Sequence, residues 1–293
     1  MRQEPRDDWV YWVLLAHYAT KETRKRFWQE RPDNLGRFLR EQPDWDVLEP
    51  HIVQQAMLLH TLSEQGGCLL TLDDEAYPDT LRQLQGVRPP LVLYALGDVR
   101  LLRESPFVAL AGSRNASPQA LQEAERITTE LVAEGYHTIT GFAKGIDEIV
   151  VQTTLQRDGK TIGVLAQGLL NPLTQRAARA YMHALNDDRL LFLSELHPNT
   201  AWSGSFAMMR NRLVAGLADF LIIVESGPEQ RQRNGKTVRS GTFECAKIAQ
   251  KMGRPVYALD LPAEGNRQLI AQGIAQRWND AGKTPTFPQG TLF

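Results

Sequence analysis

The sequence has little cysteine and no long apolar run. Its 293 residues include two cysteines, Cys68 and Cys245, and no Cys-x-x-Cys pair. A disulfide-based framework is therefore excluded, and a reducing, cytoplasmic compartment is expected. No apolar run approaches the length of a membrane span, so we expect no membrane partner. We also expect no signal peptide, because Asp7 and Asp8 precede only a brief apolar run.

The sequence also lacks an excess of charge of one sign. Its formal net charge is −1 at pH 7, so no global basic field indicates a nucleic-acid partner, and any anion-binding site must be local. It contains no Gly-x-Gly-x-x-Gly motif, no internal repeat and no low-complexity tract. Nothing in it predicts a metal ion or a cofactor.

The segment 107–147 predicts one β-α-β unit. An apolar run at 107–111 is typical of a strand that is buried on both faces. Ser117 offers an N-cap to a helix that ends before Gly135, and a second strand follows at 137–140. Because parallel strands end at the same edge of a sheet, both glycine-bearing turns of this unit should meet at one ligand-binding edge.

Apolar strands and helices continue to alternate after residue 147. We expect strands at 161–165, 190–193, 220–224 and 255–259, and helices at 172–185, 206–217, 242–252 and 267–278. This alternation predicts an α/β fold with a doubly wound parallel sheet and helices on both of its faces.

The chain before this unit is expected to divide into two parts. Residues 1–65 predict a small all-helical domain whose aromatic side chains fill its own core. Such a bundle is able to bind DNA, but packing explains the aromatics more simply. Residues 66–106 predict connecting strands that lead into the sheet, 107–280 the main domain, and 281–293 a loosely ordered tail.

Two turns of the β-α-β unit are candidate phosphate sites. Gly112, Ser113 and Arg114 follow the first strand, where backbone amides and a guanidinium group suit an anion. Alone this signal is weak, because Gly-Ser after a strand often makes only a tight turn. In the second turn, Gly141 and Gly145 flank Lys144.

Asp147 follows the second turn. Its more ordinary interpretation is a helix cap, and the alternative is a catalytic carboxylate.

Two further segments are candidates for the same edge. Met209-Arg210-Asn211-Arg212 carries two cations that point to different sides if helical, so one of them could be only a surface charge. Ser240-Gly241-Thr242 opens a helix and presents backbone donors. The basic segment 227–239 between them is interpreted either as a solvated loop or as an arm that follows a nucleic-acid backbone. Together these turns predict one crevice lined by Arg114, Lys144, Arg210 and Arg212.

The chain resembles the DNA-processing protein A (DprA/Smf) family over roughly residues 66–278. The resemblance is carried, in order, by ALAGSRNASP, TGFAKGIDEIVVQTTL, GKTIGVLAQGL, SELHPNT, FAMMRNRLVAGLADFLIIVES, SGTFECAKIAQKMGRPVYAL and GNRQLIAQGI. It implies an extended Rossmann-like fold of the SLOG superfamily behind a SAM-like helical domain. It also implies binding of single-stranded DNA, a homodimer, and transfer of the strand to a RecA-type recombinase in natural transformation. The family's basic pocket maps onto Arg114, Lys144, Arg210, Asn211 and Arg212.

The chain departs from the family pattern at several positions. Val151 stands where the family usually has histidine, and Gln119-Ala120 replaces a usual glycine. The segment 227–239 is longer than the family's usual link, and no winged-helix domain is expected after residue 278. These departures bear on the role, which we expect to be in DNA uptake, recombination or phage defence, more than on the fold.

One departure indicates an alternative function. Gly241-Thr242-Phe243-Glu244 resembles the turn of the lonely-guy phosphoribohydrolases, which share this superfamily and cleave the N-glycosidic bond of nucleoside monophosphates. By that resemblance Arg210 and Glu244 would be the catalytic pair, with Glu244 stabilising an oxocarbenium-like centre. Related SLOG domains sense nucleotide-derived signals instead. We expect a binding protein without catalytic residues, with this enzyme as the alternative.

Overall fold

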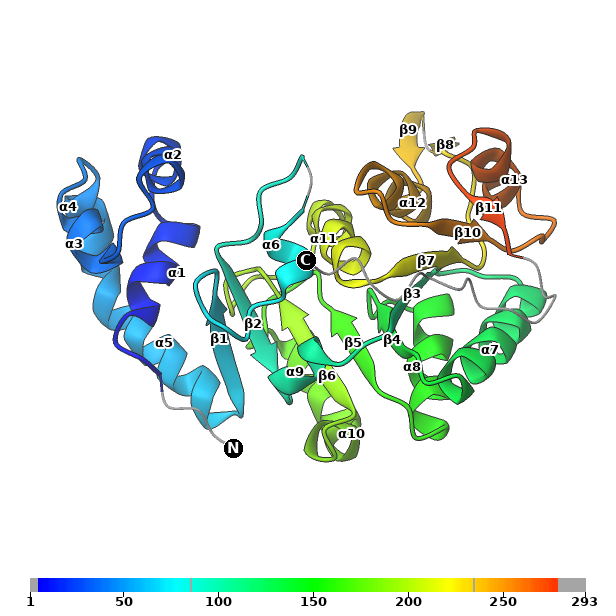
Figure 1. Cartoon of the computed structure of the whole chain (residues 1–293), viewed down its shortest axis with the longest axis horizontal. Coiled ribbons are helices and arrows are strands. Elements are labelled where there is room, and N and C mark those ends of the chain that lie inside the picture. The colour runs from blue at the N-terminus through cyan, green and yellow to red at the C-terminus, as the bar shows by residue number, and fades with distance from the viewer. Residues whose placement is uncertain (1–4, 85, 234, 279–293) are drawn as a thin grey trace.

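The computed structural model describes residues 5–84, 86–233 and 235–278 and has a nine-stranded sheet as its centre (Figure 1). The strand order is β1-β2-β6-β5-β4-β3-β7-β10-β11. The strands are β1 (Gly67–Thr71), β2 (Val92–Leu96), β3 (Phe107–Ala111), β4 (His137–Thr140), β5 (Thr161–Val164), β6 (Leu190–Ser194), β7 (Phe220–Ile223), β10 (Val256–Ala258) and β11 (Gln276–Arg277).

The direction of the strands places a ligand-binding crevice at the centre of the sheet. From β6 to β11 every neighbouring pair is parallel, whereas β1 and β2 are antiparallel to their neighbours. The chain winds from β3 through β4 and β5 to β6, and then returns to the other side of β3 with β7. Open α/β sheets bind ligands at such a reversal, outside the carboxyl ends of the strands.

Helices cover both faces of the sheet, which confirms the predicted fold class. The helices of the sheet region are α6 (Asp79–Arg82), η2 (Val99–Arg103), α7 (Pro118–Ala133), α8 (Ile146–Gln156), α9 (Pro172–Ala180), α10 (Met182–Asn186), α11 (Gly204–Leu217), α12 (Gly241–Lys251) and α13 (Glu264–Ala271). Figure 1 shows α7 and α8 on one face and α11 and α12 on the other. Alternate residues of β3 explain this: Val108 and Leu110 belong to the α7–α8 core, and Ala109 belongs to the opposite one.

The amino-terminal helices form a layer against β1 and β2. They are α1 (Trp9–His17), α2 (Lys21–Glu30), α3 (Leu35–Arg40), α4 (Trp45–Leu48), η1 (Glu49–His51) and α5 (Ile52–Glu64). Trp9, Trp12, Phe27 and Phe38 are buried, as the sequence predicts, but their core is continuous with that of the sheet. The predicted domain boundaries remain predictions. The predicted tail, 281–293, lies outside the described residues.

Three predicted elements differ in the structure. The helix expected at 172–185 is interrupted at Tyr181 and forms α9 and α10. The helix expected at 267–278 was wrong: α13 ends at Ala271, Gly273 adopts a positive φ of 67°, and the chain returns to the sheet as β11. The segment 227–239 contains an antiparallel hairpin of β8 (Gln230–Arg233) and β9 (Lys236–Arg239).

The described part of the chain contains the helices named above. None of the helices in that part combines the length and the apolar character that crossing a bilayer requires.

Candidate functional site

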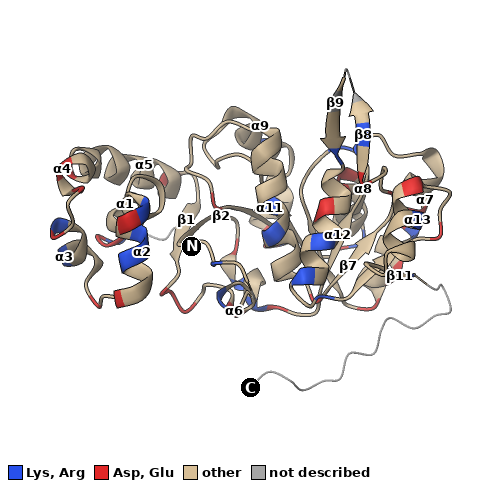
Figure 2. Ribbon diagram, turned by 90° about the horizontal axis from the view of Figure 1, so that it is seen from above, with Lys and Arg blue, Asp and Glu red and all other residues tan. Residues whose placement is uncertain are grey.

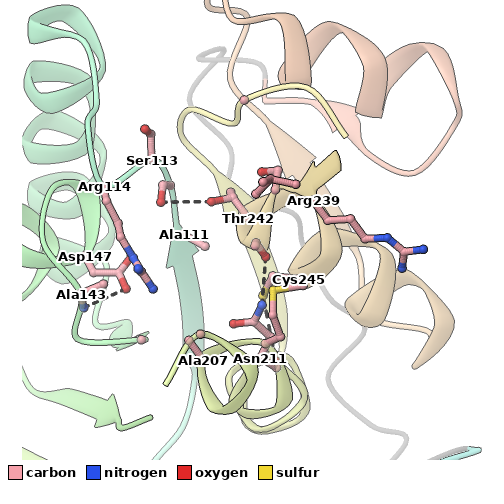
Figure 3. A pocket seen from close by; sticks show the side chains of 18 of the residues that line it. Ala111, Ser113, Arg114, Ala143, Asp147, Ala207, Asn211, Arg239, Thr242 and Cys245 are labelled. Atoms are coloured by element: carbon pink, nitrogen blue, oxygen red, sulfur yellow. Dashed lines mark hydrogen bonds between the residues drawn. The ribbon is translucent and has the colours of Figure 1, made fainter. Parts of the chain in front are cut away.

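A cavity of about 540 Å³ opens at the carboxyl ends of β3 and β7, where the winding of the sheet reverses. Its walls come from the β3–α7 turn, the β4–α8 turn, α11, the β8–β9 hairpin and the start of α12 (Figure 3). Most of the residues that the sequence predicts as a site line this cavity: Gly112, Ser113, Arg114, Gly141, Arg210, Asn211, Ser240, Gly241 and Thr242.

The turn after β3 is held by backbone hydrogen bonds. The Ser113 amide donates to the Glu225 carbonyl at 2.8 Å, and the Ser113 carbonyl accepts from the Ile146 amide at 3.3 Å. Gly112 must be glycine, because an added Cβ would lie 2.3 Å from Cγ1 of Ile146. Arg114 is exposed, and its guanidinium carbon lies 5.4 Å from the centre of the Trp202 ring. The turn therefore presents one exposed cation beside an exposed aromatic ring.

The turn after β4 brings the chain against the first turn. Gly145 has a φ of 80° and passes so close to the first turn that an added Cβ would lie 2.4 Å from the Ser113 carbonyl oxygen. Gly141 packs against the guanidinium group of Arg210, where an added Cβ would lie 1.3 Å from Nη1. Both glycines are therefore required by close approach, and Gly141 makes room for a functional side chain.

Arg210 is the central cation of the cavity. Its side chain is 7% exposed, and within the described residues its Nε atom has no hydrogen-bond partner. Burial lowers the pKa of Arg210, and the nearby Asp147 partly opposes that shift. A buried donor without a partner costs roughly 1–3 kcal/mol. Arg210 also lines the cavity, so its guanidinium group can donate to a ligand oxygen there.

Asp147 is the acidic group of the cavity. Burial raises its pKa, whereas Arg210 and the Ala143 amide lower it. Its Oδ2 accepts from the Ala143 amide at 3.2 Å, a contact drawn in Figure 3. The prediction that Asp147 caps α8 was wrong, because the N-cap of that helix is Gly145. It instead lies in the first turn of α8, closes the preceding loop and balances the charge of Arg210.

The start of α12 is fixed by three polar side chains. Ser240 caps the helix by accepting from the Phe243 amide. Thr242 Oγ1 donates to the Gly112 carbonyl at 3.1 Å, and Asn211 Nδ2 donates to the Gly241 carbonyl at 2.9 Å. These contacts tie α12 to β3 and to α11, so that the amino end of α12 borders the cavity with its backbone donors.

Four cationic side chains were expected to line the crevice, but two of them, Arg212 and Lys144, lie elsewhere. Arg212 is on the other side of α11 and forms an ion pair with Glu195 at the end of β6. Lys144 is exposed and is not among the described residues that line the cavity. The segment 210–212 lies within α11, which begins at Gly204 after the cap Ser203, so the helix predicted at 206–217 is confirmed.

The hairpin adds lining residues that the sequence reasoning missed. Arg231, Val238 and Arg239 contribute to the cavity wall, although the side chain of Arg239 extends away from it in Figure 3. The signal for the hairpin is present in the sequence: Asn234-Gly235 is the dipeptide that most strongly predicts a two-residue hairpin turn. Gly235 has the positive φ, 71°, that this turn requires.

Glu244 lies in the first turn of α12 and is half-buried. It is not among the described residues that line the cavity. Its position suits the positive end of the helix dipole. Gly241 and Thr242, at the start of the same helix, do line the cavity.

Comparisons with known proteins identify the family of this chain. The family model of DNA recombination-mediator protein A matches residues 68–286. DNA processing protein DprA of Bacillus subtilis is 30% identical over 227 residues, which are 76% of this chain and 72% of that protein. DprA of Streptococcus pneumoniae is 31% identical over 205 residues, 68% of this chain and 67% of that protein.

Two solved structures share the fold. The crystal structure of S. pneumoniae DprA matches with a TM-score of 0.71 at 24% identity and covers 94% of this chain and 95% of its own. DprA of Helicobacter pylori, whose structure concerns its single-stranded DNA binding mode, matches with a TM-score of 0.59 at 26% identity and covers 71% of this chain and 90% of its own. The chain therefore belongs to the DNA recombination-mediator protein A family.

Proposed function

We propose that this protein binds single-stranded DNA, and that it does so by holding phosphates of the strand in the cavity between β3 and β7. The observation that carries the proposal is the local charge. The chain has a formal net charge of −1, yet the described residues that line the cavity include Arg114, Arg210 and Arg231 and a single carboxylate, Asp147, while a fourth lining arginine, Arg239, turns its side chain away. An anionic ligand would therefore find a strongly favourable field at this one place.

The arrangement suits a phosphate backbone more than a base edge. Arg210 offers its guanidinium group to the cavity, and the start of α12 and the β3–α7 turn offer backbone amides. None of these groups distinguishes one base from another, so the binding should depend little on sequence. The related H. pylori protein, studied for its single-stranded DNA binding mode, supports the same class of ligand.

The proposal is tested by measuring affinity for an oligothymidylate against salt concentration. Phosphate contacts predict a steep fall, with a slope of about −0.7 per phosphate neutralised. Arg114→Ala and Arg210→Ala should each weaken binding roughly 10- to 100-fold, as expected for one lost charge-assisted hydrogen bond of about 1.5–3 kcal/mol. Circular dichroism should show an unchanged fold. Binding that ignores salt, or no binding at low salt, would contradict the proposal.

We further propose that the bound strand is passed to a RecA-type recombinase by a homodimer, in DNA uptake, recombination or phage defence. The support is membership of the recombination-mediator family. Light scattering of the free protein measures the oligomeric state. Co-purification with a RecA-type recombinase in the presence and absence of single strands measures the handover. A monomer at micromolar concentration would remove the homodimer from this scheme.

A further inference from the structure

Phosphate contacts in the cavity do not by themselves select a single strand. Both strands of a duplex carry the same phosphates, and contacts to phosphate position a nucleic acid without reading its bases. In the view of Figure 2, basic and acidic residues are interspersed along the described chain, so the overall charge makes no such choice either. A single strand differs from a duplex in having exposed base faces, which stack on aromatic rings. The described residues that line the cavity include no aromatic side chain, so such a ring has to come from beside it.

Trp202 places an aromatic ring beside the cavity. It lies in the segment between β6 and α11, two residues before Gly204, which lines the cavity wall. Trp202 is 45% exposed, whereas the other five tryptophans of the chain, all within the described residues, are buried or half-buried. Tryptophan combines a large apolar face with a polar N–H group, and for this reason it is frequent in binding surfaces.

Arg114 links this ring to the phosphate site. Its guanidinium carbon lies 5.4 Å from the centre of the Trp202 ring, within the range of a cation–π contact. The same arginine is exposed and lines the cavity, so it is accessible to a ligand. Within one nucleotide, a single sugar joins the phosphate to the base. A phosphate that accepts a hydrogen bond from Arg114 therefore brings a base near Trp202.

We propose that Trp202 is the surface on which one unpaired base of the strand stacks, and that it selects a single strand over a duplex. The inference rests on the proposed binding of single-stranded DNA. Every base has a π face and is able to stack, so this selection adds little preference for sequence. A base in a duplex has to leave its own stack and its pairing partner before it reaches the ring, which costs free energy. The cavity then holds the backbone, and Trp202 distinguishes free bases from paired ones.

The experiment compares single-stranded with duplex DNA. Trp202→Ala should weaken binding of a 30-nucleotide oligothymidylate about 5- to 100-fold, as expected for one lost base–aromatic stack. At low salt its affinity for a 30-base-pair duplex should stay within about 2-fold of that of the parent, because the phosphate contacts are kept. Trp202→Phe keeps an aromatic ring and should restore most of the affinity for the single strand.

The matched control removes another exposed apolar side chain. Leu173 on α9 is 55% exposed and is not among the described residues that line the cavity. Leu173→Ala should therefore bind both DNAs as the parent does. If Leu173→Ala and Trp202→Ala lose the same single-strand affinity, the effect is not specific to the ring, and the proposal is overturned.

A strand of abasic sites separates stacking from the phosphate contacts. It keeps the phosphates and lacks the bases, so the parent and Trp202→Ala should bind it equally. A loss that persists on the abasic strand would show that Trp202 acts only by positioning Arg114, and stacking would be excluded. If Trp202→Ala binds the oligothymidylate as tightly as the parent does, the ring is not a contact, while the proposed function stands. If the parent binds neither strand at low salt, the proposed function itself fails.

Discussion

Arg210 reaches the cavity because residue 141 has no side chain. The guanidinium group occupies the space where a Cβ of residue 141 would lie. Arg210 is only 7% exposed, so the surrounding atoms restrict its side chain to this position. Burying this cation is costly, and Asp147 offsets the cost only in part. Gly141 and Arg210 therefore act as a unit, in which the missing side chain of one residue makes room for the cation of the other at the cavity.

Gly141→Ala should disable the site without removing a charge. The added methyl group forces the Arg210 guanidinium to move, so affinity for single strands should fall about as far as in Arg210→Ala, roughly 10- to 100-fold. Gly204→Ala is the matched control, because Gly204 also lines the cavity but has no atom within 4 Å of an added Cβ. Fluorescence anisotropy measures both. Normal affinity of Gly141→Ala would show that Arg210 is not the anion-binding group.

Glu244 decides between the binding protein and the alternative enzyme. It lies in the first turn of α12 and is not among the described residues that line the cavity. We expect no free base when the protein is incubated with nucleoside monophosphates and analysed by chromatography. Glu244→Gln should bind single strands at least as tightly, because one negative charge is removed near a polyanion. Base release that disappears in this variant would establish a phosphoribohydrolase.

The ion pair of Arg212 with Glu195 joins two elements, α11 and the end of β6. Both side chains are largely buried, at 17% and 11% exposure, and burial raises the pKa of Glu195. Arg212→Gln leaves a buried carboxyl without its partner, so it should lower the free energy of unfolding by about 3 kcal/mol. Urea denaturation measures this loss. The affinity of Arg212→Gln for DNA should be nearly unchanged, in contrast to that of Arg210→Ala. A large loss of affinity with normal stability would show that Arg212 belongs to the binding site.

The elements that the sequence predicts well are those with local signals at both ends. Helix α7 has the cap Ser117 and the terminating Gly135, and its bounds were predicted almost to the residue. Strand β11 is only two residues long, and a periodic pattern of apolar residues cannot predict so short an element. The hairpin also has a local signal, Asn234-Gly235, but the high charge of that segment favours a solvated loop or an extended arm and masks it.

The sequence predicts where the candidate site lies, but it does not predict which side chains line the cavity. The spacing of Arg210 and Arg212 indicates that they face different sides of a helix, and this is what the structure shows. Which of the two faces the cavity depends on how α11 lies on the sheet. That arrangement is set by contacts distant in sequence, such as Asn211 with Gly241. Local patterns carry no information about such contacts.

The whole molecule should lose stability in mild acid through the contact between the helical layer and the sheet. His17 on α1 lies 3.1 Å from the Tyr94 hydroxyl on β2, and its ring packs against that of His197. Burial, together with the nearby His197 and Arg24, lowers the pKa of His17 to about 3. Unfolded histidine titrates near 6.5. Unfolding therefore takes up a proton below that pH, and the stability is present above pH 6.5 and falls between about 6.5 and 3.

This group alone should cost about 2 kcal/mol of stability at pH 5. Thermal unfolding at pH 7.5 and pH 5.0 measures the loss. His17→Gln should reduce the difference between the two melting temperatures. His60→Gln is the control, because the His60 side chain is 69% exposed and should leave that difference unchanged. Equal pH dependence in the parent and both variants would exclude His17 as the responsible group.

The pairing of β2 with β6 has a consequence for how the chain is made. Tyr94 pairs with Ser194, 100 residues later in the sequence. A ribosome that adds about 5–20 residues per second needs roughly 5–20 s to synthesise the intervening chain. During that interval the nascent amino-terminal layer has emerged with the hydrogen-bonding edge of β2 unpaired. Chain termination or ribosome pausing before residue 190 should therefore release fragments that associate edge to edge, and this is the stage at which the protein most needs a chaperone.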